Sequence, residues 1–515
     1  MTTTPVGTFC LVLHTHLPWL AHHGSWPVGE EWLHQAWAHS YQRVLGVLDD
    51  LASQGRTDLL TLGVTPVVAA QLDDPYCLSI QETWLHDWHW RAVGMTAERH
   101  DADLARWEAV QARRAIEDFA RWSRGASPVL RPLVDNGVIE ILGGPLAHPF
   151  QPLLDPQLVD FELAAGLMDA RLRLGSTPAG IWAPECAYRP GLEEHYARHS
   201  VRHLMLDGPT VQHVGASIHE AHPLGDSGVL AFARDLDVTY RVWSPRRGYP
   251  GGKWYRDFHS YDHAWGFRHN RVTSPTTPAH EKAPYDPARA AEAVHRDAVD
   301  FVQTVRQRLI TIREERGGRP GLTVAAYDTE LFGHWWYEGP DWLAEVLRLL
   351  PEAGVQVTTL SGAVDQGLVG RAIEPGSGSW GAGKDWHIWN GETVHGIVAD
   401  NARAQSRVLE LLKSTDPAEG RSSTADQLVR QLVLALQSDW AFMVSHDSAA
   451  HYARSRHEAH HWSLAELVDR IEEFGWQDPR TLELVDRQLV GDGPFGYLDA
   501  RWLADTAGSP LGYRR

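Results

Sequence analysis

The sequence predicts an α/β fold of buried parallel strands, followed by a unit made only of helices. Four short apolar runs alternate with stretches of helical periodicity, which is typical of strands buried on both faces of a sheet. From about residue 400 onward, apolar residues recur at helical spacing without strand-like alternation. The four apolar runs cover residues 9–13, 138–142, 180–186 and 322–328.

Helical stretches and one long irregular segment lie between and after these runs. Residues 59–71 combine a strand with a loop. Residues 207–282 are rich in Gly, Pro, His and aromatic residues and have weak periodicity, so we expect a functional insertion over the strands. The predicted helices cover residues 30–55, 98–124, 155–174 and 283–316, and then 403–413, 424–438, 446–474 and 480–489.

Charge and cysteine content argue against two classes of partner and favour a reducing compartment. The chain has 515 residues and a net charge of −19, and this charge argues against nucleic acid and anionic membrane as partners. Its three cysteines are far apart in sequence, which favours a reducing compartment. The N-terminal segment lacks a basic region, and its apolar run is too short for a membrane span. We therefore expect a cytoplasmic protein.

The 23 tryptophans are unusually many, and their placement favours a polysaccharide groove. About half of them are expected to lie in the core, where aromatic rings bury most area. The others stand beside Gly, Asp, His and Pro in predicted loops, where indole faces can stack on sugar rings. These loop residues are Trp254, Trp265, Trp335, Trp336, Trp380, Trp386 and Trp389.

Two carboxylates and three histidines follow the ends of the four apolar runs. Glu185 and Asp328 each end a run, and functional groups gather at the carboxyl ends of parallel strands in barrels. Two carboxylates at one rim are what glycosidic bond chemistry needs. His14, His16 and His148 follow the other two runs, so they are expected at the same rim.

Each of these residues has a plainer interpretation. Glu185 would suit a helix start, and Asp328 is a favoured helix N-cap residue. His14 and His16 lie on the same side of an extended segment, so they suit a zinc pair or hydrogen bonds to sugar hydroxyls. Structural histidines with satisfied hydrogen bonds are a third possibility.

Taken together and in order, the segments resemble glycoside hydrolase family 57, and within it the 1,4-α-glucan branching enzymes. The resemblance covers nearly the whole chain, and its third and fourth motifs are the most specific. The fifth motif is matched less continuously, by Trp380, Trp389 and the Ser-Asp-Trp at 438–440. The first four are LHTHLP at 13–18, GGPLAH at 143–148, WAPECAY at 182–188 and YDTELFGHWW at 327–336.

The resemblance implies a (β/α)7 barrel with an inserted, mostly helical segment and a C-terminal all-helical domain. The expected catalytic domain is 1–395, with insertions near 76–130 and 207–282, and the helical domain 396–515 closes the substrate groove. The implied reaction is retaining transfer of an α-glucan segment to a 6-hydroxyl, without metal or cofactor. Glu185 is the implied nucleophile and Asp328 the acid/base, with their carboxyl groups about 5 to 5.5 Å apart.

The resemblance also assigns substrate contacts, some of them near a mobile cover. The branching members of the family carry a Tyr on a flexible loop after the nucleophile, but this sequence has no Tyr between Tyr196 and Tyr240. We therefore expect a shortened loop, which leaves the ratio of branching to hydrolysis open. The expected α-glucan partner is glycogen, amylose or a modified glucan, such as a methylated or acylated one. The implied substrate contacts are His14, His16, Trp32, His148, Cys186, Tyr249, Arg256, Trp265, Gly266, Trp380, Trp389 and Asp439.

Several other functions remain open at this point. An α-glucan hydrolase or a 4-α-glucanotransferase would use the same two carboxylates. A zinc amidohydrolase or deacetylase would use His14, His16 and Asp328 as ligands and leave Glu185 without a role. A non-catalytic glucan-binding protein would explain the tryptophans but neither carboxylate.

Overall fold

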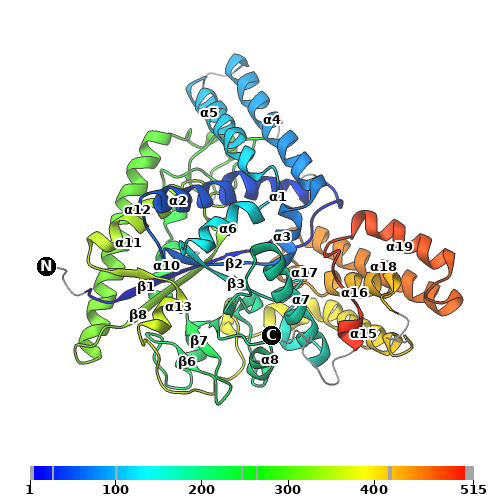
Figure 1. The fold of residues 1–515 in the computed structure, drawn as a ribbon. Coiled ribbons are helices and arrows are strands. Elements are labelled where there is room, and N and C mark those ends of the chain that lie inside the picture. The colour runs from blue at the N-terminus through cyan, green and yellow to red at the C-terminus, as the bar shows by residue number, and fades with distance from the viewer. Residues whose placement is uncertain are drawn as a thin grey trace.

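The computed structural model describes residues 5–25, 28–98, 102–244, 248–262, 265–274, 276–415 and 420–504. A parallel sheet forms its centre (Figure 1). Its strands lie in the order β7-β5-β4-β3-β2-β1-β8. The backbone N–H of Asp235, just after β7, donates to Val324 O of β8 at 2.8 Å and brings the two ends of this order together. These strands are β1 (Thr8–Thr15), β2 (Leu60–Val64), β3 (Ile139–Gly143), β4 (Gly180–Ile181), β5 (His203–Leu206), β7 (Leu230–Ala233) and β8 (Leu322–Asp328).

The (β/α)7 barrel predicted for the chain is confirmed. Every residue of β1 is buried, as an apolar run between two neighbouring strands requires. Two short strands extend the sheet: β6 (His222–Pro223) pairs antiparallel with β7, and β9 (Gln356–Thr358) pairs with the start of β1. The parallel pairing of β1 with β8 places His14 directly opposite Asp328, so these two rim residues are neighbours.

Helices connect and cover the strands, and their ends follow local sequence signals. Helix α7 (Pro156–Leu174) begins where the Asp155 side chain accepts from Gln157 N, and it ends at Gly175, whose φ is 82°. Long helices α11 and α12 run side by side on the barrel. Other helices of the barrel are α1 (Glu30–Ala36), α2 (Gln42–Ser53), α3 (Pro66–Leu72), α6 (Ser127–Asp135), α8 (Leu192–Arg198), α11 (Pro287–Glu315), α12 (Gly339–Glu352) and α13 (Leu360–Asp365).

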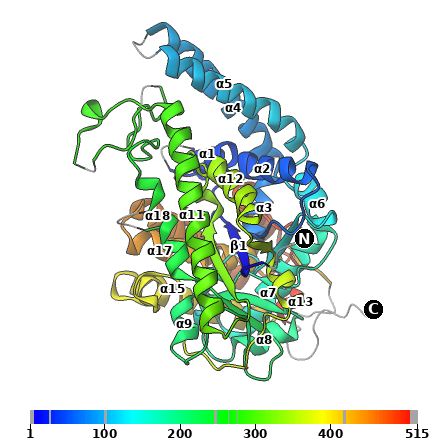
Figure 2. The same cartoon turned by 90° about the vertical axis from the view of Figure 1, so that its left-hand side faces the viewer.

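Two long helices form a hairpin that projects from the barrel (Figures 1 and 2). They are α4 (Pro75–Glu98) and α5 (Ala102–Phe119). The helix predicted over 98–124 therefore corresponds to α5 and the short turn η2 (Ala120–Trp122) after it. The other helix of the hairpin, α4, has little amphipathic character.

The prediction of one irregular insertion over 207–282 is wrong for its first half. That half contains α9 (Gly208–Gln212), the barrel strand β7 and α10 (Leu236–Val242). A strand of only four residues shows no measurable alternation, which is why the sequence pattern missed it. Irregular structure with short turns occupies the described residues from 248 to 282.

The described part of the C-terminal region consists of helices joined by turns and loops, as predicted. The predicted helix over 424–438 is interrupted at Leu436 and Gln437, so that a separate helix begins at Ser438. This break matters because it presents Ser438 and Asp439 at a helix start. The helices are α15 (His395–Leu412), α16 (Ser423–Ala435), α17 (Ser438–Ser445), α18 (Ala450–Phe474), α19 (Pro479–Gly491) and α20 (Arg501–Ala504). No helix in the described residues is long and apolar enough to cross a membrane.

Candidate active site

Glu185 lies just beyond β4, in a short turn with unusual backbone geometry. The turn η4 (Pro184–Cys186) gives Glu185 a φ of 62° and Cys186 a φ of 47°. Left-handed conformations of non-glycine residues are uncommon and gather at functional sites, where the surroundings enforce them. One such constraint is the backbone N–H of Trp380, which donates to Glu185 O at 2.9 Å.

Both carboxylate oxygens of Glu185 accept a hydrogen bond from a side chain. Ser438 Oγ donates to Oε1 at 2.7 Å, and Trp380 Nε1 donates to Oε2 at 2.8 Å. Glu185 is 8% exposed, and burial raises its pKa to about 7 although both donors oppose this shift. The carboxylate is therefore fixed in orientation and lies in an environment poor in water.

Asp328 ends β8 at the same rim and is half-buried. Burial raises its pKa to about 7, against the opposing effect of His16 and Arg234. A carboxyl group with such a pKa can carry a proton at neutral pH and give it to a leaving group. Glu330, two residues further on, accepts from His16 N at 3.1 Å and from Tyr41 Oη at 2.6 Å, which anchors the turn after Asp328.

His14 and His148 form a buried pair of neutral imidazoles. Their Nε2 atoms lie 3.0 Å apart, and the His14 ring stacks on Trp182 with centroids 4.4 Å apart. Burial lowers the pKa of both rings well below the usual histidine value. His148 Nδ1 lies 3.0 Å from Ser438 Oγ, and Ser438 in turn donates to Glu185, so Ser438 connects the histidine pair to Glu185.

Helix α7 packs against the loop that carries His148 and holds it in place. Gly166 of α7 packs so closely that an added Cβ would lie 2.0 Å from Gly144 O. Glu162 of the same helix accepts from Ala147 N at 2.9 Å. His148 then adopts a φ of 61°, which turns the ring into the rim.

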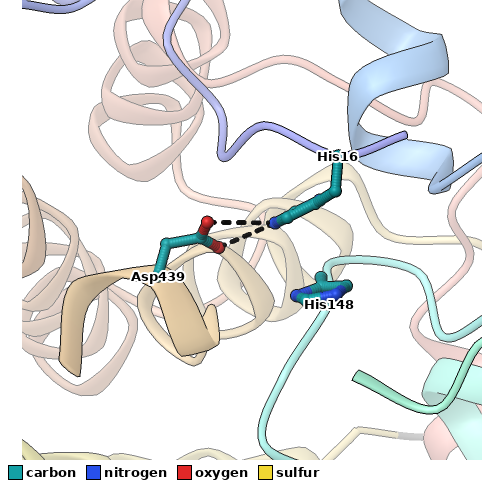
Figure 3. Close-up of side chains that lie close together, drawn as sticks. All are labelled: His16, His148 and Asp439. Atoms are coloured by element: carbon teal, nitrogen blue, oxygen red, sulfur yellow. Dashed lines mark hydrogen bonds and ion pairs between the residues drawn. The ribbon is translucent and has the colours of Figure 1, made fainter. Parts of the chain in front are cut away.

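His16 joins the barrel to the C-terminal helices. Its Nε2 lies 2.9 Å from Asp439 Oδ2 (Figure 3). Its Nδ1 lies 3.0 Å from Thr65 Oγ1. His16, His148 and Asp439 offer ligand atoms within 4.8 Å of one another, a spacing that would suit a metal ion. Hydrogen bonds already engage these atoms: Asp439 binds His16 Nε2, and the two nitrogens of His148 face His14 and Ser438. We therefore assign the three residues to hydrogen bonding.

The ligand set of the zinc hypothesis does not assemble. Among the residues that the structure describes, His14, His16 and Asp328 do not form a group with metal-ligand spacing. The Nε2 atom of His14 faces His148 instead. Glu185, which the zinc hypothesis left without a role, is the group on which the hydrogen bonds of this rim converge.

Four predicted substrate contacts hold the irregular segment against its neighbours. Arg256 forms a buried ion pair with Glu108 of α5 at 2.8 Å. Arg91 of α4 donates to Trp265 O at 3.0 Å, and an added Cβ on Gly266 would collide with the same guanidinium. Tyr249 donates its hydroxyl to a carboxylate of α11, that of Asp300. Their glucan contacts remain a prediction.

Three further candidates differ in how much surface they offer. Trp389 is 1% exposed and stacks on Phe150 with centroids 5.0 Å apart, so the expectation of an exposed platform is wrong for this residue. Cys186 is fully buried, and burial raises its thiol pKa well above the usual value, which makes it unreactive. Trp32 is half-buried, with its ring edge-on to Tyr452.

The functional residue that the sequence analysis missed is Ser438. It lies directly before Asp439 in the fifth motif, but the sequence pattern placed it at the end of the helix predicted over 424–438. Its neighbourhood in the motif was the one available signal. The structure gives it contacts to both Glu185 and His148.

Comparison with known proteins places this geometry in a family. The sequence profile of glycosyl hydrolase family 57 matches residues 10–372, which include both rim carboxylates. The chain belongs to glycosyl hydrolase family 57. A second profile, that of the 1,4-alpha-glucan branching enzyme C-terminal region, matches residues 401–502 and thus Ser438 and Asp439.

Similar proteins cover almost the whole chain. A probable 1,4-alpha-glucan branching enzyme of Mycobacterium tuberculosis is 50% identical over 96% of this chain and 98% of its own length. The crystal structure of a branching enzyme from Thermococcus kodakaraensis has a TM-score of 0.90 and 29% identity, over 97% of this chain and 96% of that one. The α-amylase AmyC from Thermotoga maritima has a TM-score of 0.84 and 26% identity, over 97% and 99%.

Replacing Trp380 by Phe is expected to lower kcat about 10- to 100-fold, the effect of losing a hydrogen bond to a charged group. Phe keeps an aromatic ring against Trp182 but removes the N–H that holds Glu185 Oε2. Steady-state kinetics on amylose measure the effect. If Trp380 acted only as a stacking platform, KM would rise and kcat would stay near the wild-type value.

Replacing Trp389 by Ala is expected to act on stability instead. The ring fills a buried cluster with Phe150 and Trp440, so its loss should cost about 3–5 kcal/mol of unfolding free energy. Denaturant unfolding measures this cost. A fully stable variant with weakened glucan binding would restore the platform interpretation.

Proposed function

We propose that this protein is a 1,4-α-glucan branching enzyme. It cleaves an α-1,4-glucan and transfers the cut segment to a 6-hydroxyl, forming an α-1,6 branch. One observation carries the proposal: a C-terminal region that matches branching enzymes contributes Ser438 and Asp439 to the same site as the two rim carboxylates of a family 57 barrel. The substrate class is α-glucan polysaccharide.

In the first half of the reaction, Glu185 is the nucleophile. One of its carboxylate oxygens forms a bond to the anomeric carbon while the bond from that carbon to O4 of the next glucose breaks. Asp328 gives its proton to the departing O4. The products are a shortened glucan with a free 4-hydroxyl and a glycosyl ester on Glu185.

In the second half, an acceptor glucan takes the place of the departed chain. Its 6-hydroxyl gives a proton to the Asp328 carboxylate and forms a bond to the anomeric carbon, while the ester bond to Glu185 breaks. Two inversions at this carbon retain its α configuration. Burial around Glu185 favours the sugar acceptor over water by limiting the access of water to the ester.

The second candidate is an α-glucan hydrolase with the same two carboxylates. It is favoured by the structural similarity to an α-amylase and by the lack of a Tyr between Tyr196 and Tyr240. A hydrolase would admit water where the branching enzyme admits a sugar hydroxyl. The C-terminal match and the 50% identical relative favour branching.

Incubation with amylose separates these functions. Counting α-1,6 linkages by NMR against new reducing ends should give many branches for few reducing ends. New reducing ends without branches would support the hydrolase. Redistributed α-1,4 chain lengths without either would support a 4-α-glucanotransferase.

Chelation is expected to leave the activity unchanged. The proposed steps use only carboxyl, hydroxyl and indole groups, and the histidines of the rim are engaged with one another. Activity after treatment with EDTA, with and without added Zn²⁺, tests this prediction. Loss of activity on chelation that zinc restores would favour the amidohydrolase hypothesis.

The remaining sequence-based predictions concern cellular location and nucleic-acid binding. We propose a cytoplasmic location, because the three cysteines are far apart in sequence and suit a reducing compartment. The acidic net charge of −19 supports a protein that does not bind nucleic acid. Cell fractionation and a nucleic-acid shift assay test the two statements.

A further inference from the structure

Four side chains form a continuous hydrogen-bonded series from the barrel to Glu185. His14 Nε2 and His148 Nε2 lie 3.0 Å apart, and His148 Nδ1 lies 3.0 Å from Ser438 Oγ. Ser438 Oγ in turn lies 2.7 Å from Glu185 Oε1. His14, His148 and Ser438 are each at most 3% exposed. Water therefore has little access to this series.

The chemistry of each group fixes which atom donates and which accepts in every hydrogen bond of the series. We call this order, from His14 as first donor to Glu185 as last acceptor, the direction of the series. An ionised Glu185 can only accept, so Ser438 donates its single proton to it. The Ser438 oxygen then accepts from His148 Nδ1–H, which leaves His148 Nε2 without a proton. His148 Nε2 accepts in turn from His14 Nε2–H, because a close contact between two ring nitrogens needs one proton between them.

A separate observation agrees with this direction. The series leaves His14 Nδ1 without a proton, and this atom is buried with no hydrogen-bond partner. An N–H at this position would be a buried donor without an acceptor, which costs more than a bare nitrogen. Both imidazoles are neutral in this arrangement, as their burial requires.

We propose that Ser438 is a positioning residue for the nucleophile, and that His148 and His14 hold its hydroxyl in the donating orientation. The proposal rests on the proposed function, in which Glu185 is the nucleophile. Ser438 reaches the barrel through the start of α17, where its N–H donates to His148 O at 3.0 Å and Gln437 pairs with Pro149. The helical C-terminal region thus completes the catalytic group of the barrel.

The hydroxyl serves both halves of the reaction. Before attack it stabilises the charge of Glu185, which burial and the nearby charges of Asp328 and Asp439 oppose. The charge disappears as the glycosyl ester forms and returns as the carboxylate leaves. Ser438 then donates to the departing carboxylate. Loss of its hydroxyl should therefore slow the second step by making Glu185 a poorer leaving group, and the first step by lowering the ionised fraction of Glu185.

The first test compares Ser438→Ala with Ser438→Thr. Ala should lower kcat about 10- to 100-fold with little change in KM, and should move the acid limb of the pH profile to higher pH. Thr keeps the hydroxyl and should recover most of the activity. Ser445→Ala is the matched control: it removes a hydroxyl at the other end of α17, one that donates to Ile388 O.

The second test addresses the direction of the series. In His148→Asn the side-chain N–H₂ can replace the Nδ1–H that donates to Ser438, whereas Gln places its amide nearer the former Nε2. Asn should therefore retain at least about tenfold more activity than Gln, the effect of one hydrogen bond. Equal activity of the two variants would overturn the assigned direction.

The outcomes separate this proposal from the proposed function. A wild-type protein that is inactive on amylose would contradict the function. An active wild type with Ser438→Ala within twofold of it, or with Ser445→Ala equally impaired, would overturn the positioning role. Thermal unfolding of each variant identifies any that lose activity through loss of the fold.

Discussion

Glu185→Gln should lower glucan transfer by several orders of magnitude while binding of glycogen survives. The change keeps the side-chain shape but removes the charge that attacks the anomeric carbon. It also gives an N–H₂ to one of two donors, so either Ser438 or Trp380 loses its acceptor. Steady-state transfer on amylose and a glycogen binding assay measure the two properties.

The control for this variant is Glu194→Gln, on the exposed face of α8. It makes the same chemical change nine residues along the chain and should leave transfer unchanged. Near-normal turnover of Glu185→Gln would remove Glu185 from the nucleophile role. Asp328 would then be the first alternative to test.

Asp328→Asn should lower turnover of amylose by about 10²- to 10⁴-fold, the usual effect of losing a general acid. Activated aryl glycosides should be affected much less in the first step, because their leaving groups need no proton. Added azide should rescue the second step, since it attacks without general base help. Equal loss on amylose and on activated substrates would contradict the acid/base role.

The same two groups determine the dependence on pH. The active form needs Glu185 ionised and Asp328 protonated, and burial raises both pKa values to about 7. The rate should fall below neutral pH as Glu185 gains a proton and above it as Asp328 loses one. Asp328→Asn should lose the alkaline limb, because an amide does not titrate. A profile of kcat/KM against pH for both proteins measures this.

Local patterns predicted the buried strands and the residues at their ends, whereas the seven-stranded barrel was implied by the resemblance to family 57. Glu185 and Asp328 each end an apolar run, and parallel strands bring such ends to one edge. His14 follows from the same reasoning, and register places it beside Asp328. Strand β7 was missed because four residues are too few for a pattern.

What the sequence could not predict depends on contacts between distant segments. Ser438 is 253 residues from Glu185, and no local pattern connects them. Trp380 and Trp389 follow the same flexible-looking stretch, yet the indole N–H of Trp380 holds Glu185 while Trp389 fills a core. Composition marks both as candidate platforms, and only packing separates them.

Mapping of the covalent intermediate tests the central claim most directly. The Asp328→Asn protein can be mixed with an α-maltosyl fluoride, whose good leaving group permits the first step, and digested for mass spectrometry. The account predicts a maltosyl mass on the peptide that contains Glu185, and none when Glu185 is also replaced by Gln. A label on another carboxylate, or inversion at the anomeric carbon without any label, would contradict it.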